Sequence, residues 1–159
     1  MYMYSAASGL YSCPLAMTDG AAKTLTKLGG RLPASDDRLM SPLEHLTSRD
    51  PEQFWTSGQW MTEKAGGSDV FAGTATTSAV DAADANSSCY RLYGQKWFSS
   101  ATDSDMTLAL ARMPPDSGVK GLGMFYVRTR NEDGSLNGIK VGCGQSVLFS
   151  EGVLSGENL

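Results

Sequence analysis

Alternating apolar and polar positions predict several short strands in the last two-thirds of the chain. Residues 105–112 alternate most clearly, because one face carries Met106, Leu108 and Leu110 and the other carries Thr107, Ala109 and Ala111. Further strand-like stretches cover residues 59–62, 72–80, 89–93, 96–100, 122–128 and 139–141, and Gly94-Gln95 is a plausible hairpin turn. About six strands at short spacing favour a mainly β fold, a closed or nearly closed antiparallel barrel.

Two helices are predicted before the strands. The first covers Pro14 to Leu28, since proline suits a first helical turn and Gly29 and Gly30 stop the helix. Its apolar face carries Leu15, Ala22, Leu25 and Leu28.

The second helix is predicted to start at Ser41, which can cap it, with Glu44 completing a capping box. Arg49-Asp50-Pro51 ends this helix early. His45, the one histidine of the chain, lies within it, and we expect it to have a packing or surface role.

Composition limits the classes of function. The 159 residues are 41% hydrophobic and 19% charged, which is enough for a packed core. A net charge of −4 without any cluster of Lys and Arg argues against binding of nucleic acid. The three widely spaced cysteines (Cys13, Cys89 and Cys143) argue against a disulfide framework and against a zinc site.

The sequence also bears on membrane insertion and secretion. No apolar run is long enough to span a bilayer, and the N-terminus lacks the basic start of a secretory signal. We therefore expect no membrane partner and an intracellular location, with cytoplasm, mitochondrion and peroxisome left open.

One glycine-containing stretch, residues 61–70, could carry chemistry. Gly66, Gly67 and Ser68 can form a nest of backbone N–H groups with a hydroxyl beside it, which suits phosphate oxygens. Thr62, six residues before Ser68, could hydrogen-bond the edge of a heterocycle at the other end of the same ligand. The plainer interpretation is a glycine turn between strands, with Thr62 facing solvent and Glu63 an ordinary turn acid.

A second stretch, residues 96–100, places two aromatic side chains beside two hydroxyls. In a strand, Trp97 and Phe98 point to opposite sides, so one could lie on a flat cofactor while the other packs in the barrel. Core packing alone would also explain both aromatic residues.

Together the two stretches resemble a known family. Thr62-Glu63-Lys64 followed by Gly66-Gly67-Ser68-Asp69-Val70, and then Gly94-x-Lys96-Trp97-Phe98-x-Ser100, resemble the middle domain of the acyl-CoA dehydrogenase family. The usual family forms are T-E-P-x-A-G-S-D and G-x-K-x-W-I-T-N. Lys64, the glycine pair and Trp97-Phe98 look most like the AidB-like alkylation-response branch. Residues 12–21, 108–112 and 121–127 are also similar, so the resemblance covers roughly residues 12–141.

The resemblance implies a flavin site. Family members bind FAD between this barrel and a C-terminal helical bundle. Thr62 should then meet the pyrimidine side of the flavin, Ser68 and the glycine pair the diphosphate, and Phe98 and Ser100 the ring near N5. The full set of cofactor-binding residues so implied is Met61, Thr62, Gly66, Gly67, Ser68, Phe98, Ser99 and Ser100.

The resemblance also implies a reaction, the α,β-dehydrogenation of an acyl-CoA. A carboxylate removes the α-proton and the flavin takes the β-hydride. The family's base lies in the C-terminal bundle, so no catalytic residue is assigned in this chain, and no metal ligand either. The expected function is the FAD-binding part of an acyl-CoA dehydrogenase-like oxidoreductase, inactive as this fragment and a homo-oligomer at full length.

Two alternatives remain beside that function. A truncated barrel could act as a non-catalytic interaction or scaffold module. A role associated with DNA repair would follow by analogy with the alkylation-response branch, although the acidic charge balance speaks against it.

By the same resemblance, residues 1–53 form a remnant of an N-terminal helical domain with its linker, and residues 54–159 form the FAD-binding barrel. Residues 141–159 are atypical, because Gly144 stands where the family has arginine. Closure of the barrel after Val141 is left open, and an unpaired edge strand would favour association.

Overall fold

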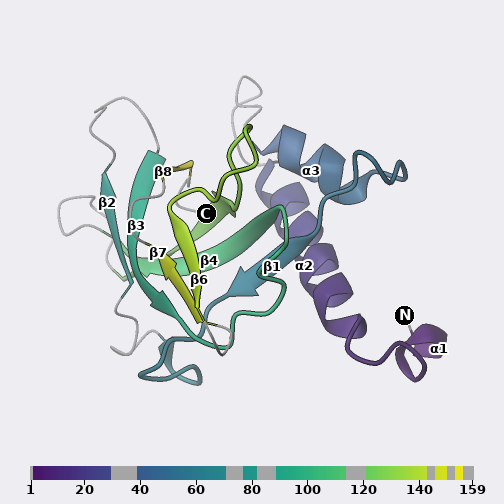
Figure 1. The fold of residues 1–159 in the computed structure, drawn as a ribbon, viewed down its shortest axis with the longest axis horizontal. Coiled ribbons are helices and arrows are strands. Elements are labelled where there is room, and N and C mark those ends of the chain that lie inside the picture. The colour runs from purple at the N-terminus through teal and green to yellow at the C-terminus, as the bar shows by residue number, and fades with distance from the viewer. Residues whose placement is uncertain are drawn as a thin grey trace.

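Helices come first along the chain and strands follow. The computed structural model describes residues 2–29, 39–70, 77–81, 89–113, 121–142, 146–149 and 153–155. Its elements are α1 (Tyr2–Ser5), α2 (Ser12–Gly29), α3 (Met40–Thr47), β1 (Ser57–Trp60), β2 (Ser78–Asp81), β3 (Cys89–Lys96), β4 (Met106–Arg112), β5 (Leu122–Arg128), β6 (Ile139–Gly142), β7 (Ser146–Phe149) and β8 (Val153–Ser155). The helices α2 and α3 lie together on one side of the sheet, next to β1 (Figure 1).

The prediction of a mainly β fold is confirmed, but the sheet is mixed instead of purely antiparallel. Strand β4 pairs with β5 in antiparallel fashion and with both β1 and β2 in parallel. A parallel pair needs a long connection, and residues 61–105 provide one between β1 and β4. That connection contains both candidate stretches, residues 61–70 and 96–100. The pairing of β1 with β4 therefore brings the start of the first stretch and the end of the second toward neighbouring strands.

The predicted hairpin turn at Gly94-Gln95 is wrong. Strand β3 runs without interruption from Cys89 to Lys96, and Gly94 pairs with Phe149 of β7. Gly94 has a φ of 150°, and a Cβ on it would lie 2.6 Å from the Cα of Thr77. Glycine is therefore needed here for the close approach of the start of β2, and not for a turn.

The end of the chain contributes strands to the sheet. Strands β6 and β7 form an antiparallel pair, and β7 continues along the edge of β3 at Gly94 to Lys96. Strand β8 pairs with β3 at Cys89 to Arg91, further along. Residues 146–149 and 153–155 thus extend the sheet, whereas residues 143–145 (with Cys143 and Gly144), 150–152 and 156–159 lie outside the described part of the chain.

Strand β4 separates two hydrophobic clusters, as its alternation predicted. Ala109 and Ala111 face the interior of the barrel, whereas Met106 and Leu108 face the helices. The barrel cluster consists of Trp60, Ala79, Leu92, Ala109, Ala111, Met113, Phe125, Val127, Ile139, Val147 and Phe149. The helix-side cluster consists of Ala21, Leu25, Leu39, Leu46, Met106, Leu108 and Tyr126.

The first predicted helix is confirmed as α2, with a shifted buried face. Thr18, Ala21 and Leu25 are buried, whereas Leu15 is 36% exposed. The Thr18 hydroxyl accepts a hydrogen bond from the Ser57 backbone N–H at 3.1 Å and donates to the Pro14 carbonyl at 2.9 Å. A polar contact that ties α2 to β1 thus replaces part of the expected apolar face.

The second predicted helix is confirmed as α3, but its predicted capping box is wrong. Leu39 occupies the N-cap position, and no side chain caps the helix. Leu39 is 4% exposed, so its burial in the helix-side cluster sets where the helix begins. His45 stacks on Trp55 with ring centroids 4.1 Å apart, which confirms a packing role.

The structure does not describe or test some of the remaining predictions. Residues 72–76 of a predicted strand and residues 82–88 lie outside the described residues. No helix in the described ranges is long and apolar enough to cross a membrane. The division of the chain at residues 53 and 54 stays a prediction.

Two glycines should respond in opposite ways to replacement by alanine. Gly20 lies inside α2, and a Cβ there would meet no atom within 4 Å, so Gly20→Ala should raise the free energy of unfolding by about 0.5–1 kcal/mol. Gly94→Ala should lower it by about 1–3 kcal/mol, because the methyl group would overlap Thr77. Urea unfolding followed by tryptophan fluorescence measures both; effects of the same sign would contradict the assigned environments.

Candidate functional site

The first candidate stretch forms a tight turn directly after β1. Glu63 and Gly66 exchange both backbone hydrogen bonds, at 3.1 and 3.0 Å. Thr62 is half-buried at the base of this turn, and Gly67 and Ser68 are exposed beyond it. The stretch therefore leaves the sheet, reverses, and presents its glycines and hydroxyl at the surface.

The glycine at position 67 is required by a close contact. A Cβ there would lie 2.9 Å from Cγ2 and 3.0 Å from Oγ1 of Thr62. Neither Gly66 nor Gly67 has a positive φ, so steric room over Thr62, and not a left-handed backbone, explains the glycine. The glycine thus lets the backbone after the turn pack directly against the Thr62 side chain.

The second candidate stretch forms a strained turn after β3. Phe98 and Ala101 have φ values of 54° and 52°, which is an uncommon conformation for residues other than glycine. The Phe98 ring is 66% exposed and lies edge-on to Trp97, with centroids 5.5 Å apart. Strain and an exposed aromatic ring in one turn are typical of a ligand-binding segment.

Trp60 anchors this turn from inside the barrel. Its indole Nε1–H donates to the Ser100 carbonyl at 3.0 Å, and Trp60 itself is 1% exposed. Ser100 is thereby fixed at the end of β1, where its half-buried side chain lies next to the first stretch. Sequence analysis did not assign Trp60, because a tryptophan in a strand is typical of core packing.

Ser99 differs from the other predicted cofactor residues. It is 1% exposed, and its hydroxyl has no hydrogen-bond partner among the described residues. It therefore lies beneath the surface that carries Thr62 and Ser68. Its contact with a cofactor stays a prediction, as do those of the other residues in the set.

The structure brings the two candidate stretches together, as expected. The backbone N–H of Trp97 donates to the carbonyl of Thr62 at 2.9 Å. This bond joins the residue after β3 to the residue before the glycine turn. We call the joined surface, formed by Thr62, Gly66 to Ser68, Trp97, Phe98 and Ser100, the two-turn surface.

A buried ion pair lies directly behind the two-turn surface, and sequence analysis missed it. Lys96 Nζ donates to Glu63 Oε1 at 2.7 Å, with the side chains 0% and 2% exposed. The same carboxylate oxygen accepts the Thr77 backbone N–H at 3.1 Å. The interpretation of Glu63 as an ordinary turn acid is wrong, because its side chain turns inward from the turn.

The pKa of Lys96 reflects this burial. Removal from water lowers the pKa below its ordinary value, and the hydrogen bond and charge of Glu63 oppose that shift. Both side chains are almost completely shielded from solvent, so each stabilises the charged form of the other. The sequence contains a signal for the pair, since each residue adjoins a strand end, but one-dimensional spacing does not show which charges meet.

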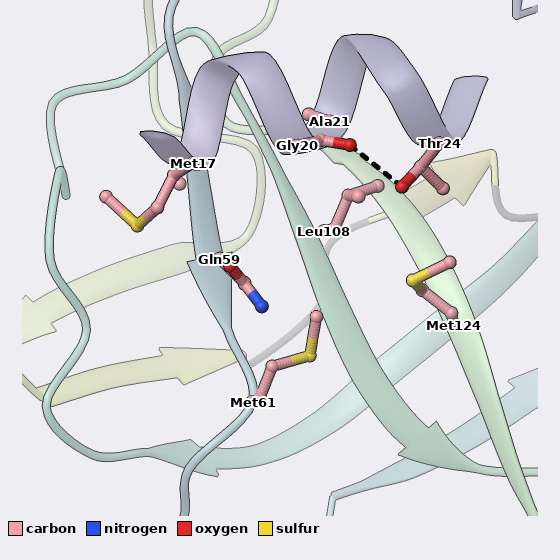
Figure 2. A pocket seen from close by; sticks show the side chains of 9 residues that line it. Met17, Gly20, Ala21, Thr24, Gln59, Met61, Leu108 and Met124 are labelled. Carbon is pink, nitrogen blue, oxygen red and sulfur yellow. Dashed lines mark hydrogen bonds between the residues drawn. The ribbon is translucent and has the colours of Figure 1, made fainter. Parts of the chain in front are cut away.

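A pocket of about 130 Å³ lies between α2 and the strands, next to the two-turn surface. In Figure 2 the side chains of Met61, Leu108 and Met124 rise from the strands toward α2. The remaining lining residues are Met17, Gly20, Ala21, Thr24, Gly58 and Gln59. Met61, which lines the pocket, directly precedes Thr62 in the chain, and its predicted contact with a flavin stays a prediction.

Comparison with known proteins identifies the middle of this chain. Residues 58–147 match the family model described as acyl-CoA dehydrogenase, middle domain. Acyl-CoA dehydrogenase family member 11 of Caenorhabditis elegans is 48% identical over 146 residues, which cover 89% of this chain and 23% of the relative. AidB of Escherichia coli strain K12 is 33% identical over 135 residues, which cover 81% of this chain and 23% of the relative.

A solved structure is similar over nearly the whole chain. The crystal structure of Caenorhabditis elegans ACDH-11 in complex with C11-CoA has a TM-score of 0.82 and 43% identity, covering 98% of this chain and 28% of that one. The chain thus spans about a quarter of the length of the curated relatives that it matches.

The buried pair should behave as a coupled unit in unfolding. Lys96→Met removes the ammonium group that is hydrogen-bonded to the buried Glu63 carboxylate, and it should cost about 3–5 kcal/mol of stability. The double variant Glu63→Gln/Lys96→Met keeps an oxygen acceptor for Thr77 and leaves no buried charge, so it should cost less than the sum of the two single changes. Urea unfolding of the four proteins measures the coupling; additive costs would contradict it.

Proposed function

This chain belongs to the acyl-CoA dehydrogenase family, and from that premise we propose that it forms the FAD-binding barrel of a flavin oxidoreductase acting on the CH–CH bond of acyl-CoA substrates. The family consists of flavoproteins. The observation that carries the proposal is the two-turn surface, where Thr62 and Trp97 are hydrogen-bonded and glycine, hydroxyl and aromatic groups face solvent side by side.

The residues of the two-turn surface fit a flavin. Gly67 and Ser68 are both exposed, so the Ser68 hydroxyl and the backbone beside it are accessible to phosphate oxygens. At the other turn, the exposed Phe98 ring offers an apolar face to a flat ring system. Thr62 and Ser100 supply hydroxyls that can donate or accept at the edge of that ring system.

When bound, FAD supplies the acceptor for a hydride. The residues of this chain would bind and orient it, through Thr62 and Ser100 at the ring and Gly67 and Ser68 at the diphosphate. Glu63 is unsuited to remove a substrate proton, because its carboxylate is buried against Lys96 and Thr77. We therefore place the group that accepts the substrate proton outside the two-turn surface.

We further assign the α2 pocket to the acyl chain of the substrate. ACDH-11, the relative of known structure, is described in complex with C11-CoA. The pocket walls are largely thioether and aliphatic groups, which adapt to an alkyl chain. Because Met61 lines the pocket and adjoins Thr62, an acyl chain in the pocket would begin beside the flavin surface.

A non-catalytic interaction module is the second candidate. Large apolar side chains on α1 and in the segment between α1 and α2 are exposed, including Met3 at 91%, Leu10 at 89% and Tyr11 at 67%. Exposed apolar surface of this kind is typical of an interface with another protein segment. A chain that associates through these residues but takes up no FAD would support this function.

Flavin binding is tested by titrating the chain with FAD and following flavin fluorescence. We expect weak binding, because one wall of the site is supplied by this chain and the ligand's lost freedom opposes association. Ser68→Ala and Ser100→Ala should each raise Kd about threefold to tenfold, the value of one hydrogen bond. Ser41→Ala, an exposed serine that caps nothing, is the matched control and should leave Kd unchanged. A titration in which the flavin fluorescence does not change with added chain would contradict the proposal.

The pocket assignment is tested with acyl-CoA thioesters of two lengths. Met124→Trp fills the pocket and should weaken binding of an eleven-carbon acyl-CoA while leaving acetyl-CoA unaffected, since each buried methylene contributes about 0.8 kcal/mol. Met124→Leu, which conserves volume, is the control. Calorimetry on the FAD-saturated chain measures both; equal losses for the two thioesters would place the acyl chain elsewhere.

A further inference from the structure

We infer that the buried Glu63–Lys96 pair is a positioning element, which holds the two halves of the two-turn surface at a fixed separation and orientation. The inference rests on the proposed function for its ligand, FAD. It assigns to this pair no contact with the cofactor and no part in proton transfer. Its effect is on the geometry of the groups next to it along the chain.

The pair adjoins both halves of the surface in sequence. Glu63 follows Thr62, and Lys96 precedes Trp97. Neighbouring residues of extended backbone point to opposite sides. The two charged side chains point inward, while half-buried Thr62 and Trp97 lie toward the surface. Any shift of either charged side chain therefore moves a residue of the two-turn surface.

Two connections one residue apart define an orientation, whereas one connection would permit a hinge. The first is the backbone hydrogen bond from Trp97 to Thr62, at 2.9 Å. The second is the ion pair, at 2.7 Å, between the side chains of the adjoining residues. With both in place, the glycine turn cannot rotate about the Thr62–Trp97 bond without separating two buried charges.

A third connection ties the pair to the sheet. Glu63 Oε1 also accepts the backbone N–H of Thr77, the residue before β2. Thr77 in turn lies so close to Gly94 of β3 that a Cβ on the glycine would overlap it. The pair is thereby connected to β2 and β3. The sheet therefore restrains the position of the two-turn surface.

Thermodynamic stability alone gives little reason for charges at this position. Burying two charges carries a large desolvation cost, and apolar side chains of similar volume are often equally stabilising or better. The lowered pKa of Lys96 has this cost as its main cause. An ion pair, unlike an apolar contact, is directional and therefore fixes the relative placement of the chains that carry it.

The test compares a pair-deleted chain with a chain of reduced stability that keeps the pair. Glu63→Gln/Lys96→Met removes both charges, and Val127→Ala truncates a fully buried core residue of β5, outside the two-turn surface. FAD affinity is measured by fluorescence titration. Exchange of the Trp97 amide hydrogen, which is bonded to Thr62, is measured by NMR without FAD.

We expect Kd for FAD to rise about tenfold in the double variant and less than about twofold in Val127→Ala. The Trp97 amide should exchange faster in the double variant than in Val127→Ala when both are compared at equal global stability. Unchanged Kd together with unchanged Trp97 exchange in a folded double variant would overturn the inference. If the unmodified chain binds no FAD, the proposed function fails, while the exchange measurement still decides whether the pair positions the surface.

Discussion

The contact between Glu63 and Lys96 is the constraint on which the site depends. It joins residues 33 positions apart, with both side chains at most 2% exposed. Each member stabilises the buried charge of the other, so the segments that carry Glu63 and Lys96 are held together. Once they meet, the glycine turn and the strained Phe98 turn lie side by side. The surface is thus a consequence of an interior contact.

Local patterns were sufficient to predict the elements but not how they pair. The alternation in residues 105–112 predicted both buried faces of β4, and Pro14 to Gly29 predicted α2 to within two residues. The parallel pairing of β1 with β4 depends on a connection of residues 61–105, and no short-range pattern encodes it. The sequence predicts a turn at Gly94, because glycine occurs both in turns and at close contacts between strands. The close approach of Thr77 shows that Gly94 belongs to the second case.

The candidate site was predictable in its surface groups and not in its support. Thr62, Ser68 and Ser100 were assigned through the resemblance to the family, whose motifs include hydroxyl residues at these positions. Glu63 and Lys96 look like exposed charges until the fold buries them, and Trp60 looks like core until its indole is seen to hold Ser100. A residue's burial depends on the tertiary structure, which is why the supporting residues were missed.

The motif that identified the family therefore has two layers. Glu63, Gly94 and Lys96 serve the interior, through an ion pair and a close strand approach. Thr62, Gly67, Ser68 and Ser100 lie toward the surface, where a ligand would meet them. The inner layer can be retained for folding alone, because breaking it leaves a buried charge or a steric clash whether or not a flavin binds. Only the outer layer responds to a ligand requirement. Within that outer layer Gly67 is already required by its contact with Thr62, whereas the hydroxyls of Thr62, Ser68 and Ser100 have no such steric requirement. The retention of these hydroxyls, more than the match to the motif as a whole, favours flavin binding.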